Sequence, residues 1–452
     1  MNGDLLLSFY GDDFTGSTDA MEALSLAGIR TVLFLDPPSP TLLRERFAGV
    51  EAVGAAGVSR RWTPAQMEAG LRPIFTALRD LGAPLVHYKV CSTFDSSPEI
   101  GSIGRAIEIG REIFASGWVP LVVGAPVLRR YTLFGNLFAT VGDETFRLDR
   151  HPTMSRHPVT PMHESDLRVH LGKQTSASVA LFDILQLAGI AVEVDQRLDA
   201  LLNTGPDVVL FDVLDQARLA EVGRLIHERA GAEPLFVVGS SGLEYALAAH
   251  WQASSRRPQP APPAPAEPVA QVVVVSGSCS PETQGQIAWA IDNGYVAVAL
   301  DTAQLLDPGH ADAERDRAID EALAALQGGL SVVVHSCLGP HDPRIAAASH
   351  TTRGEDGASA GATIGARLGE IMHTLLLATG IRRAIVAGGD TSGYIAHHLG
   401  IFALEMVTPT APGSPLCRAF ASDQTFDGLE IALKGGQVGK ADYFERVRRG
   451  RA

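Results

Sequence analysis

Positive charge is scarce in this chain. Its 452 residues contain 37 Lys and Arg against 51 Asp and Glu, which gives a formal net charge of −14. Binding to nucleic acid or to anionic lipid draws on clustered Lys and Arg, so the composition argues against both as partners. If the substrate is an anion, a few local cations must hold it.

Cysteines are also few, and no long hydrophobic run is present. Cys91, Cys279, Cys337 and Cys417 lie too far apart in sequence for a CxxC zinc or redox pair. The N-terminus has no basic segment, and its apolar stretch at residues 5–7 is much shorter than that of a signal peptide. We therefore expect no membrane association and a reducing, cytoplasmic setting.

Apolar residues, by contrast, are abundant enough for a folded protein. They make up 46% of the chain against 19% charged residues, and the length exceeds what one ordinary core serves. The clearest break is a Pro-rich stretch, because successive prolines favour an extended, semi-rigid conformation. We predict an N-terminal domain at residues 1–253, a linker at 254–268 and a C-terminal domain at 269–452.

Short aliphatic runs alternate with Ala-rich and Leu-rich segments of helical character on both sides of the linker. This alternation predicts an α/β protein with two lobes, each a largely parallel sheet flanked by helices. The expected strands lie at residues 5–10, 31–35, 120–123, 208–212, 235–238, 272–276, 296–300, 331–335 and 384–387. Open parallel sheets bind ligands at the carboxyl ends of their strands, so polar motifs there are the candidates for function.

The first such motif is Gly-Asp-Asp-Phe-Thr-Gly-Ser, between the first strand and a helix expected at residues 20–27. Its adjacent carboxylates, Asp12 and Asp13, could position a substrate hydroxyl and accept its proton during phosphoryl transfer. The alternative is an ordinary strand-to-helix turn in which an Asp caps the helix. Asp19 and Glu22 have the spacing of a capping box.

The second motif places a cation among hydroxyl groups. Lys89 follows an apolar run and precedes Ser92, Thr93 and Asp95. One charge-assisted bond and several neutral ones suit a polyhydroxylated carboxylate, although such residues can also serve only their own loop. Upstream, Arg60 could make a two-pronged contact with a carboxylate, but an Arg-Arg pair is often merely solvated.

Three motifs in the C-terminal half suit phosphate. Val-Ser-Gly-Ser-Cys-Ser precedes a helix expected at residues 282–292, where backbone amides and the helix dipole favour anions. Ala-Gly-Gly-Asp-Thr-Ser-Gly lies between a strand and a helix expected from Tyr394, and its glycines allow close approach of phosphate. Asp390 could instead contact Mg²⁺ or its waters. The third, at residues 433–439, contains Lys434 and could close over a nucleotide or form a surface hairpin.

Taken in order, GDDFTGSTDA, GVSRR, YKVCSTFDSSP, HPVTPMHESDL, VSGSCS, GGDTSG and LKGGQVG resemble the motifs of the four-carbon acid sugar kinase family. The resemblance spans nearly the whole chain. It implies a sugar-acid-binding N-terminal domain and a nucleotide-binding C-terminal domain that together use ATP to phosphorylate acids such as threonate, erythronate and 3-oxo-tetronates. We expect Mg²⁺ as a second cofactor and a homodimer as the assembly.

The resemblance also implies roles for particular residues. Asp12 and Asp13 would be catalytic. The substrate site would contain Ser59, Arg60 and Lys89, with Ser92, Thr93 and Asp95 from the hydroxyl-rich loop. The ATP site would contain Ser276, Ser278, Gly388, Gly389, Asp390, Thr391, Ser392 and Gly436.

Departures from the family pattern bear on the substrate. The chain has Gly11 and Ser17 where family members often have Ala, and Asp390 where Glu is usual. It resembles the branch associated with RuBisCO-like proteins, for which 3-oxo-isoapionate, a branched acid, is a candidate substrate. Two other functions remain open: a nucleotide-dependent oxidoreductase, although no clean GxGxxG turn is present, and a non-catalytic sugar-acid sensor.

Overall fold

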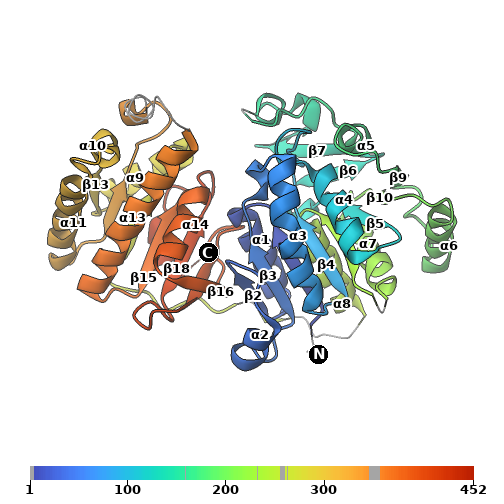
Figure 1. Ribbon diagram of the computed structural model, residues 1–452, viewed down its shortest axis with the longest axis horizontal. Coiled ribbons are helices and arrows are strands. Elements are labelled where there is room, and N and C mark those ends of the chain that lie inside the picture. Colours follow the sequence, from blue (N-terminus) through green and yellow to red (C-terminus); the bar gives the residue numbers. More distant parts are fainter. Residues whose placement is uncertain are drawn as a thin grey trace. The chain divides into compact units, whose positions relative to one another are not determined.

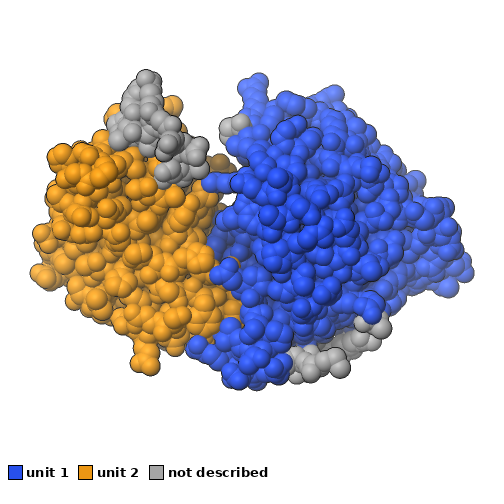
Figure 2. Space-filling model, viewed as in Figure 1, with its two compact units in different colours: residues 1–32, 36–261 blue, residues 33–35, 262–452 orange. Residues whose placement is uncertain are grey.

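The computed structural model describes residues 5–157, 159–231, 233–254, 260–261, 263–345 and 357–451, with side chains of the last range described from residue 360. Residues 255–259 and 262 of the predicted linker lie outside the described residues. The chain divides into two compact units, coloured separately in Figure 2. Unit 1 comprises residues 1–32 and 36–261, and unit 2 comprises residues 33–35 and 262–452. Within the described ranges, no helix is both long and apolar enough to cross a membrane.

Unit 1 is built on a parallel sheet. Its strands are β1 (Leu7–Gly11), β2 (Thr31–Phe34), β3 (Ala52–Ala56), β4 (Leu85–Lys89), β5 (Val119–Val122), β9 (Val179–Phe182), β10 (Val208–Phe211) and β11 (Leu235–Gly239). They lie in the order β2-β3-β1-β4-β11-β5-β10-β9, and from β3 to β9 every neighbouring pair is parallel. The central strands are buried along their whole length, as expected for a sheet covered on both faces.

Helices cover this sheet, and a small antiparallel sheet accompanies it. The helices are α1 (Phe14–Leu26), α2 (Pro40–Arg46), α3 (Pro64–Asp80), α4 (Ile103–Phe114), α5 (Leu167–Leu171), α6 (Ala191–Leu202), α7 (Gln216–Glu228) and α8 (Gly242–Ala253). Short 3₁₀ turns occur at Ser59–Arg61, Pro126–Leu128, Leu148–Arg150 and Met154–Arg156. The antiparallel sheet consists of β6 (Arg130–Leu133), β7 (Asn136–Val141) and β8 (Glu144–Arg147). Helix α3 packs against α4, and α8 packs against α1 and α7.

Unit 2 contains a mixed sheet. Its strands are β12 (Val273–Ser276), β13 (Val296–Ala299), β14 (Val332–His335), β15 (Arg383–Ala387), β16 (Ile401–Thr408), β17 (Leu416–Ala421) and β18 (Glu430–Lys434), in the order β13-β14-β12-β15-β18-β17-β16. The pairs from β13 to β18 are parallel, whereas β17 is antiparallel to both of its neighbours. The prediction of largely parallel sheets therefore misses this antiparallel edge and the small sheet of unit 1.

The helices of unit 2 are α9 (Pro281–Asp292), α10 (Thr302–Leu306), α11 (Ala311–Gln327), α13 (Gly357–Thr379), α14 (Gly389–His398) and α15 (Tyr443–Arg448). Helix α13 packs against α11 and α14, and α13 and α14 lie side by side in Figure 1. Helix α9 packs against α15. Aliphatic side chains of β12, β14 and β15 meet α9 and α15 in a common core. The α/β class predicted from the sequence is confirmed.

Each of the nine predicted strands overlaps an observed one, but two helix starts are wrong. Helix α1 begins at Phe14, and its N-cap is Asp13, whose Oδ1 accepts from the amide of Gly16 at 2.8 Å. The predicted capping box at Asp19 and Glu22 therefore falls inside the helix. Helix α14 begins at Gly389 rather than near Tyr394.

Candidate functional site

The predicted catalytic residues lie where the strand order of unit 1 reverses. From β1 the chain builds β2 and β3 on one side and then crosses to β4 on the other. In open α/β sheets, ligands bind outside the carboxyl ends of the strands at such a reversal. Asp12 and Asp13 follow β1, Arg60 follows β3, and Lys89 is the last residue of β4.

Arg60 joins the two predicted catalytic carboxylates. Its Nε and Nη2 donate to Asp12 at 3.1 and 2.7 Å, and its Nη1 and Nη2 each donate to Asp13 at 3.0 Å. The amide of Arg60 also donates to the carbonyl of Asp12 at 3.0 Å, which fixes the turn against β1. Since a guanidinium has five N–H groups, these contacts leave one on Nη1. Arg60 therefore orients Asp12 and Asp13 before any substrate arrives.

The two carboxylates differ in exposure. The side chain of Asp12 is 5% exposed and that of Asp13 is 31% exposed. Burial raises the pKa of Asp12 and the charge of Asp13 adds to this, although Arg60 opposes both effects. Asp13 is therefore the more accessible of the two carboxylates that share Arg60.

Lys89 ends β4 inside the same cluster. Its Nζ lies 3.5 Å from the Oδ2 of Asp19, on α1. Burial opposes the charged form, but Asp19 and then Asp13 outweigh it and raise the pKa of Lys89. A Cβ on Gly16 would lie 2.4 Å from Asp13 Oδ1 and 2.6 Å from this Nζ, so a larger residue would displace one or both side chains. Lys89 is thus a compensated cation held next to the first turn of α1.

The remaining substrate residues predicted from the sequence lie around this cluster. Thr93 donates from Oγ1 to the Oδ1 of Asp95 at 2.6 Å. Burial by itself would raise the pKa of Asp95, but the charge of Arg60 and the hydrogen bond from Thr93 outweigh burial and lower this pKa. Ser92, in the same loop, is half-buried. Ser59 has no exposed surface, and its hydroxyl is bonded to that of Tyr88 at 3.1 Å. Ser59 therefore supports the turn that carries Arg60.

Unit 2 has a strand-order reversal of its own. After β12 the chain builds β13 and β14 on one side and then crosses to β15 on the other. Ser276 ends β12 and Ser278 lies in the turn after it, and the turn after β15 contains Gly388 and leads into α14. All eight predicted ATP residues lie at the ends of β12, β15 and β18. The structure therefore brings motifs that span residues 276–436 of the sequence to one edge of one sheet.

Backbone contacts hold these three turns together. The amide of Gly277 donates to the carbonyl of Ala387 at 3.0 Å, and that of Gly388 donates to the carbonyl of Lys434 at 2.9 Å. Gly388 has φ 128°, which favours glycine, and a Cβ there would lie 2.9 Å from Thr391 Oγ1. A Cβ on Gly436 would lie 2.6 Å from Ser278 Oγ. The glycines are thus required by the close approach of the turns.

The other residues of the predicted ATP site occupy the first turn of α14. Gly389 is half-buried and Asp390 is exposed. Thr391 and Ser392 are buried, and Ser392 Oγ donates back to the carbonyl of Gly388 at 2.8 Å. The hydroxyl of Ser392 is therefore used inside the helix, which leaves backbone amides as the main donors of this turn.

Two contacts in this region were not predicted. Cys279, in the turn after β12, forms a disulfide with Cys337, which follows β14, and their Cα atoms lie 5.7 Å apart. Lys434, Thr283 and Ser280 surround the carbonyl of Gly436, to which all three donate. Neither feature can be predicted from local sequence, because the partners lie 58 residues apart in the disulfide and 151 residues apart for Lys434 and Thr283.

Comparison with known proteins assigns both units. A family model described as a sugar-binding N-terminal domain matches residues 7–247, and one described as a nucleotide-binding C-terminal domain matches residues 273–444. The chain belongs to the four-carbon acid sugar kinase family. The prediction of a phosphotransferase with these two domains is confirmed, and the oxidoreductase and sensor alternatives are set aside.

Full-length relatives agree with this assignment. A 3-oxo-isoapionate kinase of Paraburkholderia graminis is 51% identical, with 99% of this chain and 95% of the relative aligned. A 3-oxo-tetronate kinase of Methylobacterium radiotolerans is 34% identical, with 98% of each chain aligned. Among solved structures, a Salmonella typhimurium LT2 protein described as a putative tRNA synthase has a TM-score of 0.80 at 25% identity over 99% of both chains. This sugar-acid kinase thus shares sequence and fold with these proteins along its length.

The described residues of this kinase offer few side chains that could bind a metal ion. Within the described ranges, no group of three or more His, Cys, Asp or Glu side chains is placed to hold one. Asp390 is the only carboxylate in the turns at residues 276–280, 388–392 and 434–436. Mg²⁺ is commonly bound through one or two carboxylates together with the substrate's phosphates, and these turns fit that mode rather than a preformed cage.

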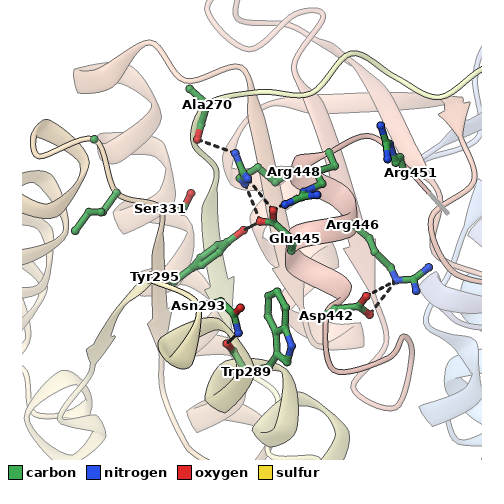
Figure 3. A pocket seen from close by; sticks show the side chains of 14 residues that line it. Ala270, Trp289, Asn293, Tyr295, Ser331, Asp442, Glu445, Arg446, Arg448 and Arg451 are labelled. Atoms are coloured by element: carbon green, nitrogen blue, oxygen red, sulfur yellow. Dashed lines mark hydrogen bonds and ion pairs between the residues drawn. The ribbon is translucent and has the colours of Figure 1, made fainter.

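A pocket of about 680 Å³ lies elsewhere in unit 2 of the kinase, beside the amino ends of β12, β13 and β14 (Figure 3). Four arginines line it, but Arg446 is bonded to Asp442, and Arg448 to Glu445. The lining acids thus neutralise much of its charge. The turns predicted to bind ATP lie at the opposite ends of these strands.

Proposed function

We propose that this kinase transfers the γ-phosphoryl group of ATP to a hydroxyl of 3-oxo-isoapionate. The observation that carries the proposal is the 51% identity with a 3-oxo-isoapionate kinase over 99% of the chain. The motif departures at Gly11, Ser17 and Asp390 agree with a subgroup distinct from the 3-oxo-tetronate kinases. A 3-oxo-tetronate is the second candidate substrate, supported by the 34% identity with the Methylobacterium enzyme.

In unit 1, Asp13 is the proposed base. The acceptor hydroxyl loses its proton to Asp13 while its oxygen bonds to the γ-phosphorus, and the bond from that phosphorus to the β,γ-bridging oxygen of ATP breaks to release ADP. Arg60 holds Asp13 and Asp12 in place, and the substrate carboxylate is bound by Lys89 with the remaining N–H of Arg60. Thr93, Asp95 and Ser92 supply hydrogen bonds to the acid's hydroxyls. Positioning and charge neutralisation are the main contributions expected in phosphoryl transfer.

In unit 2, the three turns bind the nucleotide. Backbone amides at Ser278 and at the start of α14 face the phosphates, and the N-terminus of α9, capped by Ser280, favours their negative charge. Mg²⁺ is proposed to arrive with the nucleotide and to contact Asp390 directly or through water. When bound, it would neutralise charge on the β- and γ-phosphates.

A coupled ADP-release assay tests the proposal. The panel contains 3-oxo-isoapionate, 3-oxo-tetronates, threonate and erythronate, and NMR of the product identifies the phosphorylated hydroxyl. We expect the highest kcat/KM for 3-oxo-isoapionate. A higher kcat/KM for a 3-oxo-tetronate would replace the substrate, and no ADP release with any acid would contradict the proposed reaction. Light scattering of the same sample tests the expected homodimer.

A further inference from the structure

We propose that Lys434 is the residue that binds the nucleotide's polyphosphate through a full positive charge, and that it takes up a proton as the nucleotide binds. The proposal rests on the nucleotide function proposed for unit 2. Lys434 ends β18, at the same edge of the sheet as the turns after β12 and β15.

The amine of Lys434 is buried without a carboxylate partner. The side chain has no exposed surface, and Nζ donates to Thr283 Oγ1 at 3.0 Å and to the Gly436 carbonyl at 3.3 Å. Both acceptors are neutral. An ammonium group has three donors, and no third bond is present among the described residues.

The charged and titratable groups around this amine are few. On α9, Glu282 is exposed and is the only charged group that acts on Lys434 appreciably among the described residues. On α15, the ring of Tyr443 has its centroid 5.9 Å from Nζ. The turns after β12 and β15 contribute hydroxyls, glycines and the exposed Asp390. A buried cation with such neighbours carries a desolvation cost that its hydrogen bonds offset only in part.

Burial lowers the pKa of Lys434 to about 7, with Glu282 weakly opposing. The free protein therefore holds a mixture of ammonium and neutral amine near neutral pH. A polyphosphate brought to the same turns would supply the missing negative charge and raise this pKa again, because an adjacent opposite charge favours the ionised form. A neutral ligand would supply no such compensation, so the site selects for an anion.

The sign of the linkage follows from these two states. With its pKa lowered by burial, the lysine is largely neutral at pH 8 in the free protein, whereas the nucleotide complex needs it protonated. Binding at pH 8 should therefore take up close to one proton. Above pH 7, the nucleotide Kd should rise by up to about tenfold per pH unit, until the pH reaches the pKa of Lys434 in the complex.

Isothermal titration calorimetry with ADP and Mg²⁺ tests this without turnover. Titrations at pH 8 in two buffers with different ionisation heats give the number of protons taken up, and the phosphates of ADP are already ionised at that pH. We expect about one proton for the wild-type enzyme. Lys434→Met should abolish the uptake and weaken ADP binding at pH 7 by at least about tenfold, as expected for loss of a charge-assisted contact.

Two further variants separate this role from a structural one. Lys440→Met removes an exposed lysine from the same segment and should leave both the affinity and the proton uptake unchanged. Lys434→Arg keeps a permanent charge, so any ADP binding it retains should occur without proton uptake. Wild-type ADP binding with no proton uptake, or uptake that persists in Lys434→Met, would overturn the proposal for Lys434 and leave the nucleotide function standing. Failure of the wild-type enzyme to bind ADP would overturn both.

Discussion

Two buried lysines end two parallel strands of this kinase, and their surroundings differ in one respect. Lys89 of unit 1 has Asp19 at 3.5 Å and Asp13 nearby, whereas the hydrogen-bond partners of Lys434 among the described residues are a hydroxyl and a carbonyl. The pKa of Lys89 is consequently raised and that of Lys434 is lowered to about 7, although burial acts in the same direction on both. Neighbouring carboxylates therefore decide whether the pKa of a buried lysine is raised or lowered.

The same contrast extends to the two strand-order reversals. In unit 1, Asp12 and Asp13 share Arg60, so the loops are charged but largely compensated by one another. In unit 2, the turns hold glycines and hydroxyls around an uncompensated amine. Under the proposed function, a sugar acid at the first site would share cations that already have partners, whereas a polyphosphate at the second would bring negative charge to the amine. The first arrangement suits chemistry on a hydroxyl, and the second suits anion binding.

The largest expected effect comes from removing the accessible carboxylate of unit 1. Asp13→Asn should lower kcat by about 10²- to 10⁴-fold, since that is the usual contribution of a general base. The affinity for ADP, measured by calorimetry, should be unchanged, because the nucleotide turns belong to unit 2. Asp80→Asn, which changes an exposed Asp on α3, is the matched control and should keep full activity. Near-normal turnover of Asp13→Asn would remove it as the base, and an equal loss of ADP affinity would break the division between the units.

Much of this comparison could be predicted from the sequence. Aliphatic runs such as residues 272–276 predict buried parallel strands, and polar motifs after such runs fall at the carboxyl ends of strands. That is why Asp12, Asp13 and Lys89 could be selected one motif at a time. Strand β3 was not predicted because Ala-Val-Gly-Ala-Ala has a single β-branched residue, Val53, among Ala and Gly, which are depleted in strands.

Partnerships could not be predicted, because they depend on contacts between segments that are distant in sequence. The residues around Arg60 in the sequence do not show that it contacts Asp12, 48 residues away, rather than being left unpaired for a substrate carboxylate. The Cys279–Cys337 disulfide and the contact of Lys434 with Thr283 are hidden for the same reason. The sequence allows either catalytic carboxylates or a helix-capping Asp in the turn after β1, and the structure shows that Asp13 is the N-cap of α1.

A pair of glycine substitutions tests whether the two sites can be damaged independently. Gly16→Ala would place a Cβ 2.4 Å from Asp13 Oδ1 and 2.6 Å from Lys89 Nζ, and Gly436→Ala would place one 2.6 Å from Ser278 Oγ. Overpacking of this kind costs about 1 to 3 kcal/mol of folding stability, and it should displace the side chains at the affected site. We expect Gly16→Ala to raise KM for the sugar acid and Gly436→Ala to raise the Kd for ADP. Each variant is the other's control, and parallel losses of both affinities would contradict independent sites.

The smallest expected effect comes from making Lys89 resemble Lys434. Asp19→Asn removes the carboxylate nearest to the amine while keeping its size, so burial should then lower the pKa of Lys89 relative to the wild-type enzyme. A neutral amine cannot hold the acid's carboxylate, so kcat/KM for the sugar acid should fall as pH rises, by about two- to fivefold at pH 9. The wild-type profile should stay flat over that range when the nucleotide is saturating, which removes the contribution of Lys434. Matching alkaline profiles for the two enzymes would show that Asp12 and Asp13 are sufficient to keep Lys89 charged. The difference between the two lysines would then come from these two carboxylates rather than from Asp19.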